Sequence, residues 1–344
     1  MKRIIKIILL SFSILLLMTL LIFGILVSDK ITTMLSINEI GKGLYSMNYN
    51  EDYHLDKALN SNIKDVNGLI NFIGNEMYFG YKPNLKISRF GCSAFITKTP
   101  ENINLVGRNF DFSNFTDVLC VYTHPVAGYQ SISTVQTDML GVGGLNNIST
   151  TSFLGRLALL AAPYMGVDGM NEKGLSVSLL NTDYTSTLHM NTEKPDIFIS
   201  VAVRLLLDKA ATVDEAINIL SKYDMNTAVS STQHIFIGDS NGDYAVIEWI
   251  NEKMQIVTYP VVTNFIMSKL DRSEYKNNCN RFDFLDDSLN NKPINNIDES
   301  MDLLNGARQS TTQWSVVFSL NEFKAHYVIN RKFNNIYHLN PRTF

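Results

Sequence analysis

The sequence predicts a layered α+β protein built on antiparallel β-sheets. Most strand candidates follow one another through short polar turns, and that is how antiparallel strands connect, because parallel strands need a long crossover. Helical patterns gather in the middle of the chain and again before the last two strands, where they can cover the sheets from outside. With 344 residues, 45% hydrophobic and 18% charged, the chain has room for one large domain or two small ones.

The expected strands are short runs of apolar and β-branched residues bounded by turn residues. They are Cys92–Thr97, Ile103–Phe112, Val118–Thr123, Ser131–Gln136, Gly174–Leu180, His234–Gly238, Tyr244–Ile250, Met254–Tyr259, Trp314–Leu320 and His326–Asn330. Two polar segments, 171–174 and 239–242, have the composition of hairpin turns.

The expected helices show apolar residues at helical spacing. They lie at Ser200–Lys209, Val213–Tyr223 and Ile297–Leu304, with a shorter one near 65–73. Thr212 and Glu215 have the spacing of a capping box, which predicts that the second of these helices begins there.

Residues 1–30 are expected to form an N-terminal transmembrane helix. Basic residues precede a stretch without charge from Ile7 to Ser28, which is long enough to span a bilayer. Basic residues favour the cytoplasmic side, so this prediction places a single-pass protein in the cell membrane with its remaining part on the extracytoplasmic side. The alternative is a signal peptide, whose removal would give a secreted protein.

The rest of the chain divides at Cys92. Residues 31–91 are polar and rich in Asn and Tyr, and they are expected to be a spacer or a propeptide. Residues 92–344 hold the strands and the strongest helices, and we expect them to form the main domain.

The composition argues against several classes of partner. A net charge of −4 with scattered basic residues gives no field for nucleic acid. The six histidines are dispersed and no metal-binding spacing is present, so we expect neither a metal nor another cofactor. Three cysteines leave an odd one, and the sequence leaves open whether Cys120 and Cys279 pair.

Cys92 is the candidate nucleophile, because the first two expected strands form a hairpin that returns charged residues to it. The expected register puts Cys92 opposite Asn109, with Arg108 and Asp111 both within reach of the thiol. A slip of one residue would exchange the faces that these side chains use.

A thiol with an ordinary pKa of ~8.5 is mostly protonated at neutral pH and needs a base or a positive charge nearby. Arg108 could supply the charge, but no histidine stands in an obvious relation to Cys92. A free α-amino group, with a pKa of ~7.7–8.0, could serve as the base. That chemistry requires Cys92 to become the first residue of a processed chain.

Five short motifs together resemble the choloylglycine hydrolase family, also called the linear amide C-N hydrolases. They are Cys92, Gly107-Arg108-Asn109-Phe110-Asp111, Gly169-Met170-Asn171-Glu172-Lys173-Gly174-Leu175 followed by Leu180-Asn181, Val262-Thr263-Asn264, and Asn280-Arg281-Phe282. The resemblance covers most of residues 92–344. It implies a four-layer αββα sandwich of the N-terminal nucleophile hydrolase type.

The resemblance also implies roles for the residues around the thiol. Cys92 would attack an amide carbonyl while its own α-amino group carries the proton. Asp111 would orient that amine and Arg108 would hold the thiolate. Because residues precede Cys92 here, exposing the amine needs cleavage of the Gly91-Cys92 bond, for which autoproteolysis is the hypothesis.

Three further residues are implied by the same resemblance. Asn181 and Asn264 would form the oxyanion hole, and Arg281 would favour negative charge near the nucleophile. From the sequence alone, the two asparagines could also be turn residues, and Arg281 could be a solvated arginine at a helix start.

The expected function is hydrolysis of linear amide C-N bonds in N-acyl compounds through an acyl-enzyme. The alternatives are an acyltransferase that moves the acyl group to another amine, and a non-catalytic, membrane-anchored binding domain. Phe115, Tyr129 and Tyr184 hint at an apolar acyl pocket, but the sequence does not identify the acyl group. It also leaves open whether copies of the chain associate.

Overall fold

The computed structural model describes residues 2–86, 89–182, 186–228 and 232–343. Its larger sheet has nine strands in the spatial order β1 (Asn38–Gly41), β2 (Leu44–Tyr49), β5 (Val118–Thr123), β6 (Ser131–Gln136), β7 (Gly166–Asn171), β8 (Ser176–Asn181), β11 (Gln233–Gly238), β12 (Tyr244–Ile250) and β13 (Lys253–Val257). The smaller sheet has six, in the order β14 (Val261–Val262), β3 (Gly91–Lys98), β4 (Asn104–Asp111), β15 (Thr312–Ser319), β16 (Lys324–Ile329) and β17 (Tyr337–Leu339). A separate parallel pair joins β9 (Asp196–Phe198) and β10 (Asp224–Asn226).

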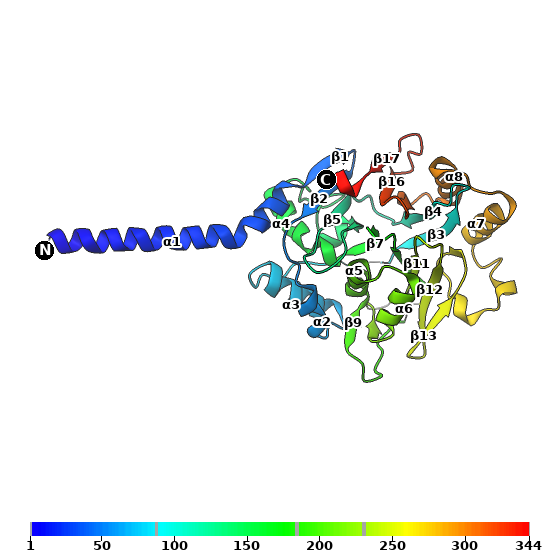
Figure 1. Ribbon diagram of the computed structural model, residues 1–344, viewed down its shortest axis with the longest axis horizontal. Coiled ribbons are helices and arrows are strands. Elements are labelled where there is room, and N and C mark those ends of the chain that lie inside the picture. The colour runs from blue at the N-terminus through cyan, green and yellow to red at the C-terminus, as the bar shows by residue number, and fades with distance from the viewer. Residues whose placement is uncertain (1, 87–88, 183–185, 229–231, 344) are drawn as a thin grey trace.

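Most helices lie around the two sheets, and α1 projects from the molecule on the side away from α7 and α8 (Figure 1). They are α1 (Lys2–Leu35), α2 (Leu55–Asn60), α3 (Val66–Met77), α4 (Phe153–Ala158), α5 (Ile199–Lys209), α6 (Val213–Leu220), α7 (Asn280–Asn291) and α8 (Ile297–Ala307). Short 3₁₀ helices are η1 (Thr137–Leu140), η2 (Leu159–Tyr164), η3 (Met267–Lys269), η4 (Arg272–Glu274) and η5 (Pro341–Thr343).

The two sheets stack face to face, with helices outside both of them. Strand β3 of the smaller sheet packs against β8 of the larger one, helices α5 and α6 contact the larger sheet, and α7 and α8 contact the smaller one. This arrangement confirms the predicted α+β sandwich with its helix–sheet–sheet–helix layers. It places the start of β3, and therefore Cys92, between the two sheets.

Most predicted strands are present with small shifts at their ends. The strands predicted at 118–123, 131–136 and 244–250 have the predicted bounds, whereas β7 was not predicted. Strand β7 is difficult to predict from sequence because Asp168 and Gly169 interrupt its apolar pattern, although all of its residues are buried. Thr212 accepts a hydrogen bond from the Glu215 N–H at 3.2 Å, so the predicted start of α6 is correct.

The predicted transmembrane helix at residues 1–30 is wrong. In the part of the chain that the structure describes, no helix is both long enough and apolar enough for a membrane span. The segment belongs to a longer helix, α1, which runs through Asp29 and Lys30 and ends against the sandwich, where Thr33 and Met34 are buried and Lys30 pairs with Glu51. The single-pass membrane location and the membrane partner inferred from that helix are corrected with it.

Residues after α1 contribute strands to the larger sheet. Strand β2 pairs in parallel with β5 from Leu44 opposite Val118 onward, so the sheet is mixed and not purely antiparallel as predicted. The hydroxyl of Tyr53 donates to Asp208 Oδ2 at 2.6 Å, which ties the same segment to α5. Whether residues 31–91 act as a spacer or as a propeptide stays a prediction.

The three cysteines are free thiols. Cys120 is buried in β5, Cys279 is half-buried before α7, and Cys92 is fully buried at the start of β3.

Candidate functional site

The β3–β4 hairpin sets the geometry around Cys92. Its turn is closed by the Thr99 N–H, which donates to Ile103 O at 2.9 Å, and Asn102 adopts a positive φ of 64° within it. Lys98 therefore pairs with Asn104, and Cys92 pairs with Phe110 and not with Asn109 as predicted. The predicted register is wrong by one residue, which places Arg108 on the face of the thiol and Asp111 on the other face.

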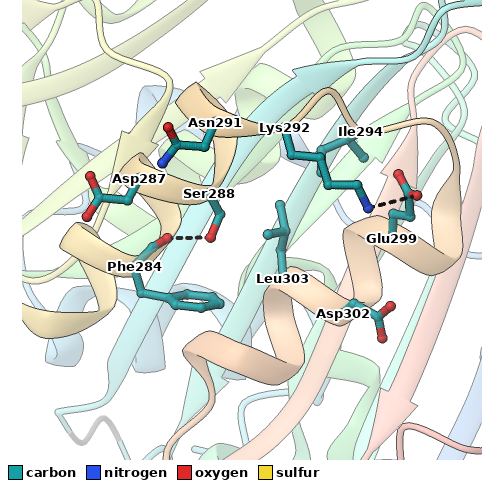
Figure 2. Close-up of a pocket in the computed structure, with 9 residues that line it drawn as sticks. All are labelled: Phe284, Asp287, Ser288, Asn291, Lys292, Ile294, Glu299, Asp302 and Leu303. Carbon is teal, nitrogen blue, oxygen red and sulfur yellow. Dashed lines mark hydrogen bonds and ion pairs between the residues drawn. The ribbon is translucent and has the colours of Figure 1, made fainter.

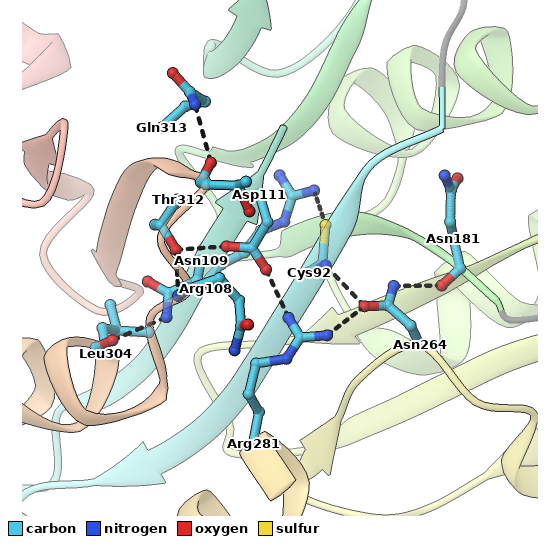
Figure 3. A network of polar contacts seen from close by, with 12 residues as sticks. Cys92, Arg108, Asn109, Asp111, Asn181, Asn264, Arg281, Leu304, Thr312 and Gln313 are labelled. Carbon is cyan, nitrogen blue, oxygen red and sulfur yellow. Dashed lines mark hydrogen bonds and ion pairs between the residues drawn. The ribbon is translucent and has the colours of Figure 1, made fainter. Parts of the chain in front are cut away.

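Arg108 is the residue that contacts the thiol (Figure 3). Its Nη2 lies 3.1 Å from Cys92 Sγ and also donates to Leu179 O at 2.7 Å. Both side chains are completely buried. Burial raises the pKa of the Cys92 thiol to about 11, although the charge of Arg108 works in the opposite direction.

Asp168 of β7 holds the other side of Arg108, and sequence reasoning missed it. The two side chains form a fully buried ion pair through Nη1, and Trp314 Nε1 donates to Asp168 Oδ2 at 3.2 Å. Trp314 in turn stacks on Phe110, with ring centroids 3.9 Å apart. The guanidinium that faces Cys92 is thus fixed from both sheets.

Asn264 lies beside the main-chain nitrogen of Cys92, as expected of a site residue. It follows β14, which pairs with β3 so that Val262 lies opposite Ala94. The Cys92 N–H donates to Asn264 Oδ1 at 2.9 Å, and Asn264 Nδ2 donates to Asn181 O at 2.6 Å. Asn181, at the end of β8, thereby joins the same group.

Arg281 connects Asp111, the remaining predicted site residue, to this group. From the first turn of α7, its Nη1 donates to Asp111 Oδ2 at 2.6 Å and its Nη2 donates to Asn264 Oδ1 at 2.7 Å. The Thr312 hydroxyl donates to Asp111 Oδ1 at 2.5 Å. Burial raises the pKa of the Asp111 carboxyl, while Arg281 and Thr312 work to lower it.

A buried pair behind Asn264 supports its loop. His234 Nε2 lies 2.8 Å from Thr263 O, and its Nδ1 lies 2.9 Å from Glu248 Oε1. Glu248 also accepts hydrogen bonds from the Met267 and Ser268 N–H groups. Burial would raise the pKa of Glu248, but the hydrogen bond and charge of His234 bring it below its usual value.

The structure therefore brings all the predicted site residues together around Cys92. The residues that sequence reasoning missed are Asp168, Thr312, His234 and Glu248, which act on the others from separate strands. A lone acidic residue inside an otherwise buried strand is the one signal that could have found Asp168 and Glu248, because a buried charge needs a partner.

Of the aromatic residues expected to line an acyl pocket, Phe115 is exposed. The ammonium of Lys173 lies over the ring of Tyr129, with Nζ 5.3 Å from the ring centroid. Tyr184 lies outside the described residues.

A surface cavity of about 500 Å³ lies between α7 and α8 (Figure 2). It is lined by Phe284, Leu303 and charged groups that include the Lys292–Glu299 ion pair. None of the predicted site residues lines it.

These features define an α+β sandwich protein with a cysteine at the start of β3 and an arginine on its thiol. The family model of linear amide C-N hydrolases, choloylglycine hydrolase family, matches residues 92–293. This chain belongs to that family. The match begins at Cys92 itself.

Individual relatives are more distant. A penicillin V acylase from Pectobacterium atrosepticum is 26% identical over 189 residues, which cover 50% of this chain and 49% of the relative. The chain thus spans about half the length of this curated relative.

Solved structures show the same fold. A mutant conjugated bile acid hydrolase from Clostridium perfringens has a TM-score of 0.55 at 16% identity, over 74% of this chain and 93% of that one. A penicillin V acylase from Agrobacterium tumefaciens has a TM-score of 0.51 at 18% identity, over 72% of this chain and 86% of that one.

Proposed function

We propose that this protein hydrolyses linear amide bonds of N-acyl compounds, with Cys92 as an N-terminal nucleophile that is exposed by cleavage of the Gly91-Cys92 bond. The observation that carries the proposal is that both reactive atoms of Cys92 are held, and by different residues. Arg108 contacts the thiol, and Asn264 accepts from the main-chain nitrogen. A cysteine that only fills the core would need neither.

Cleavage would convert that nitrogen into the base that the site otherwise lacks. In the proposed self-cleavage, Cys92 Sγ bonds to the Gly91 carbonyl carbon, the Gly91-Cys92 C–N bond breaks, and the thiol proton passes to the nitrogen. Water then hydrolyses the thioester and leaves a Gly91 carboxylate and a free thiol. Asp111 lies against this bond, since a Cβ on Gly91 would be 3.2 Å from Asp111 Oδ2.

In turnover the freed α-amino group accepts the thiol proton as Sγ attacks the substrate carbonyl, and it then gives the proton to the departing amine. Water hydrolyses the acyl-enzyme thioester and restores the thiol. Asp111 and Arg281 orient the amine, and Arg108 stabilises the thiolate. Asn181 and Asn264 act as oxyanion donors, each worth on the order of 3 kcal/mol.

The test is to sequence the N-terminus of the purified protein and to assay it on a panel of N-acyl amides. The panel includes penicillin V and a conjugated bile acid, because the relatives are named for these compounds. We expect a chain that begins at Cys92, release of free acid, and loss of both cleavage and turnover in Cys92→Ala but not in Cys279→Ala. Full activity from an intact chain would overturn the processing step, and a cut chain that hydrolyses no member of the panel would overturn the activity.

A further inference from the structure

Phe90, which stands before the proposed cleavage point, lines an apolar cavity beside the site. Its side chain is buried, and its ring lies 4.9 Å from the ring of Phe110, measured between centroids. The other lining residues are mostly apolar and include Met139, Met165, Val167, Phe198 and Ala228. Leu179 also lines the cavity, and its carbonyl oxygen accepts a hydrogen bond from the guanidinium that holds the Cys92 thiol.

The space left around Phe90 is too small for a substrate. About 30 Å³ remains open in the cavity, which is roughly the volume of one water molecule in the liquid. Pockets that bind small molecules measure ~300–1,000 Å³. A ligand can therefore enter only if one wall of the cavity moves, and Phe90 is the lining residue that lies next to the proposed cut.

The position of Phe90 relative to the scissile carbonyl indicates which part of a substrate belongs there. When Cys92 Sγ bonds to the Gly91 carbonyl and the C–N bond breaks, the thioester carries the upstream peptide as its acyl group. Phe90 is then the first side chain on the acyl side of that carbonyl. An N-acyl substrate forms the same thioester on the same sulfur, so its acyl chain leads away from the carbonyl along the path that Gly91 and Phe90 follow.

We propose that the Phe90 cavity is the acyl-binding pocket of the cut protein, and that Phe90 blocks it until cleavage. This inference rests on the proposed function. Because a glycine separates the ring from the carbonyl, the pocket fits acyl groups whose apolar end lies further out than in phenylacetyl. Octanoyl and phenylhexanoyl groups have that reach, whereas acetyl leaves the pocket empty.

The first test compares hydrolysis rates of acetyl, phenylacetyl, octanoyl and phenylhexanoyl amides of one amine by the cut protein. Each buried CH₂ contributes ~0.8 kcal/mol, so we expect kcat/KM for the octanoyl amide to exceed that for the acetyl amide by at least about a hundredfold. Ala228→Phe should lower this octanoyl-to-acetyl ratio by at least about tenfold, while Met139→Ala, which enlarges the cavity, should raise the preference for phenylhexanoyl. A ratio that neither variant changes would overturn the proposal.

The second test uses the product of self-cleavage as a probe. N-acetyl-phenylalanyl-glycine should inhibit the cut protein competitively, and N-acetyl-alanyl-glycine should inhibit it at least about tenfold more weakly. Equal inhibition by the two peptides, together with rates that do not depend on chain length, would overturn the pocket while leaving the amidase intact. A protein that begins at Cys92 and hydrolyses none of the four amides contradicts the proposed function instead.

Discussion

Cys92 and Asp111 present their side chains to opposite faces of the β3–β4 hairpin. Gly91 is the residue paired with Asp111, and Cys92 pairs with Phe110, so the carboxylate faces the peptide bond before Cys92 and not the thiol. The thiol has Arg108 on its own face. In the proposed mechanism, one set of side chains would therefore act on the thiol and another on the nitrogen of Cys92.

Asp111→Asn should slow both cleavage after Gly91 and turnover by about a hundredfold, because in the proposed mechanism this carboxylate assists proton transfer to the Cys92 nitrogen before the cut and orients the free amine after it. Loss of the intact chain over time, followed by mass spectrometry, measures the first effect. Asp117→Asn is the matched control, since that carboxylate accepts from the Thr150 hydroxyl at 2.6 Å and does not contact the site. Equal effects of the two substitutions would contradict the orienting role.

The pH dependence of alkylation should distinguish Cys92 from Cys279. Burial favours the neutral thiol, so the thiolate of Cys92 in the uncut chain forms only as pH approaches its pKa of about 11. Its alkylation rate should rise about tenfold per pH unit up to that value. A plateau below pH 9 would show that Arg108 outweighs burial.

Cys279 provides the internal comparison in the same experiment. Burial would raise the pKa of its thiol, but the Phe282 N–H, the Thr263 hydroxyl and the charge of Arg281 lower it below the ordinary value. Its alkylation should therefore level off at lower pH than that of Cys92. Peptide mapping after a brief exposure to iodoacetamide reports the two sites separately.

Arg281→Lys should reduce turnover although the charge is kept. The guanidinium reaches Asp111 and Asn264 at the same time, and a lysine ammonium cannot reproduce that planar two-sided contact. We expect kcat to fall by about ten- to a hundredfold. Arg272→Lys, which alters only an exposed arginine bonded to Thr258 O, should leave kcat unchanged.

Asp168→Asn should destabilise the protein and also slow cleavage. Removing one partner of a buried ion pair costs ~3–5 kcal/mol of unfolding free energy, measured by denaturant titration. Asp208→Asn breaks the buried ion pair with Arg204, and neither of these residues is hydrogen-bonded to Cys92. It should lower the free energy of unfolding by a similar amount without changing the cleavage rate. If the two variants slow cleavage equally, Asp168 has no positioning role through Arg108.

Glu248→Gln should remove one source of acid sensitivity. Because the folded-state pKa of Glu248 is lowered, its ionised form stabilises the fold at pH values above the ordinary pKa of 4.5, and this stability is lost as pH falls through the folded-state value. The variant should be less stable at pH 7 and should lose less on acidification. Glu252→Gln is the control, because Glu252 Oε1 accepts an exposed hydrogen bond from the Asn191 N–H at 3.1 Å. This variant should show the same pH dependence of stability as the unmodified chain.

The sequence predicted the layered fold, and that the candidate site residues lie together, more closely than it predicted the contacts among them. Turn residues and strand composition mark the sheets, and the motif around Arg108 follows Cys92 within one hairpin. The hairpin register could not be predicted to the residue, because it depends on how the Thr99–Ile103 turn closes. Asp168 acts on Arg108 from a strand 60 residues further along the chain. Glu248 pairs with His234 of the neighbouring strand, but its effect on the loop of Asn264 depends on tertiary contacts, so no local pattern predicts either role.

The N-terminal part was predicted least well. An apolar run of suitable length predicts a transmembrane helix on length alone, but the end of α1 is determined by its contacts with the sandwich. The parallel pairing of β2 with β5 is likewise a tertiary contact. It could not be predicted, because the polar segment that contains β2 has no clear strand pattern.

That parallel pairing determines what a cut after Gly91 would produce. Strand β2 would remain hydrogen-bonded to β5, and Tyr53 would remain bonded to Asp208, so the upstream fragment would persist as a subunit of a two-chain protein. A recombinant chain that begins at Cys92 would instead leave β5 as an exposed edge strand, and exposed edge strands favour aggregation. Co-expression of the two pieces is therefore the appropriate route to a mature protein that does not depend on self-cleavage.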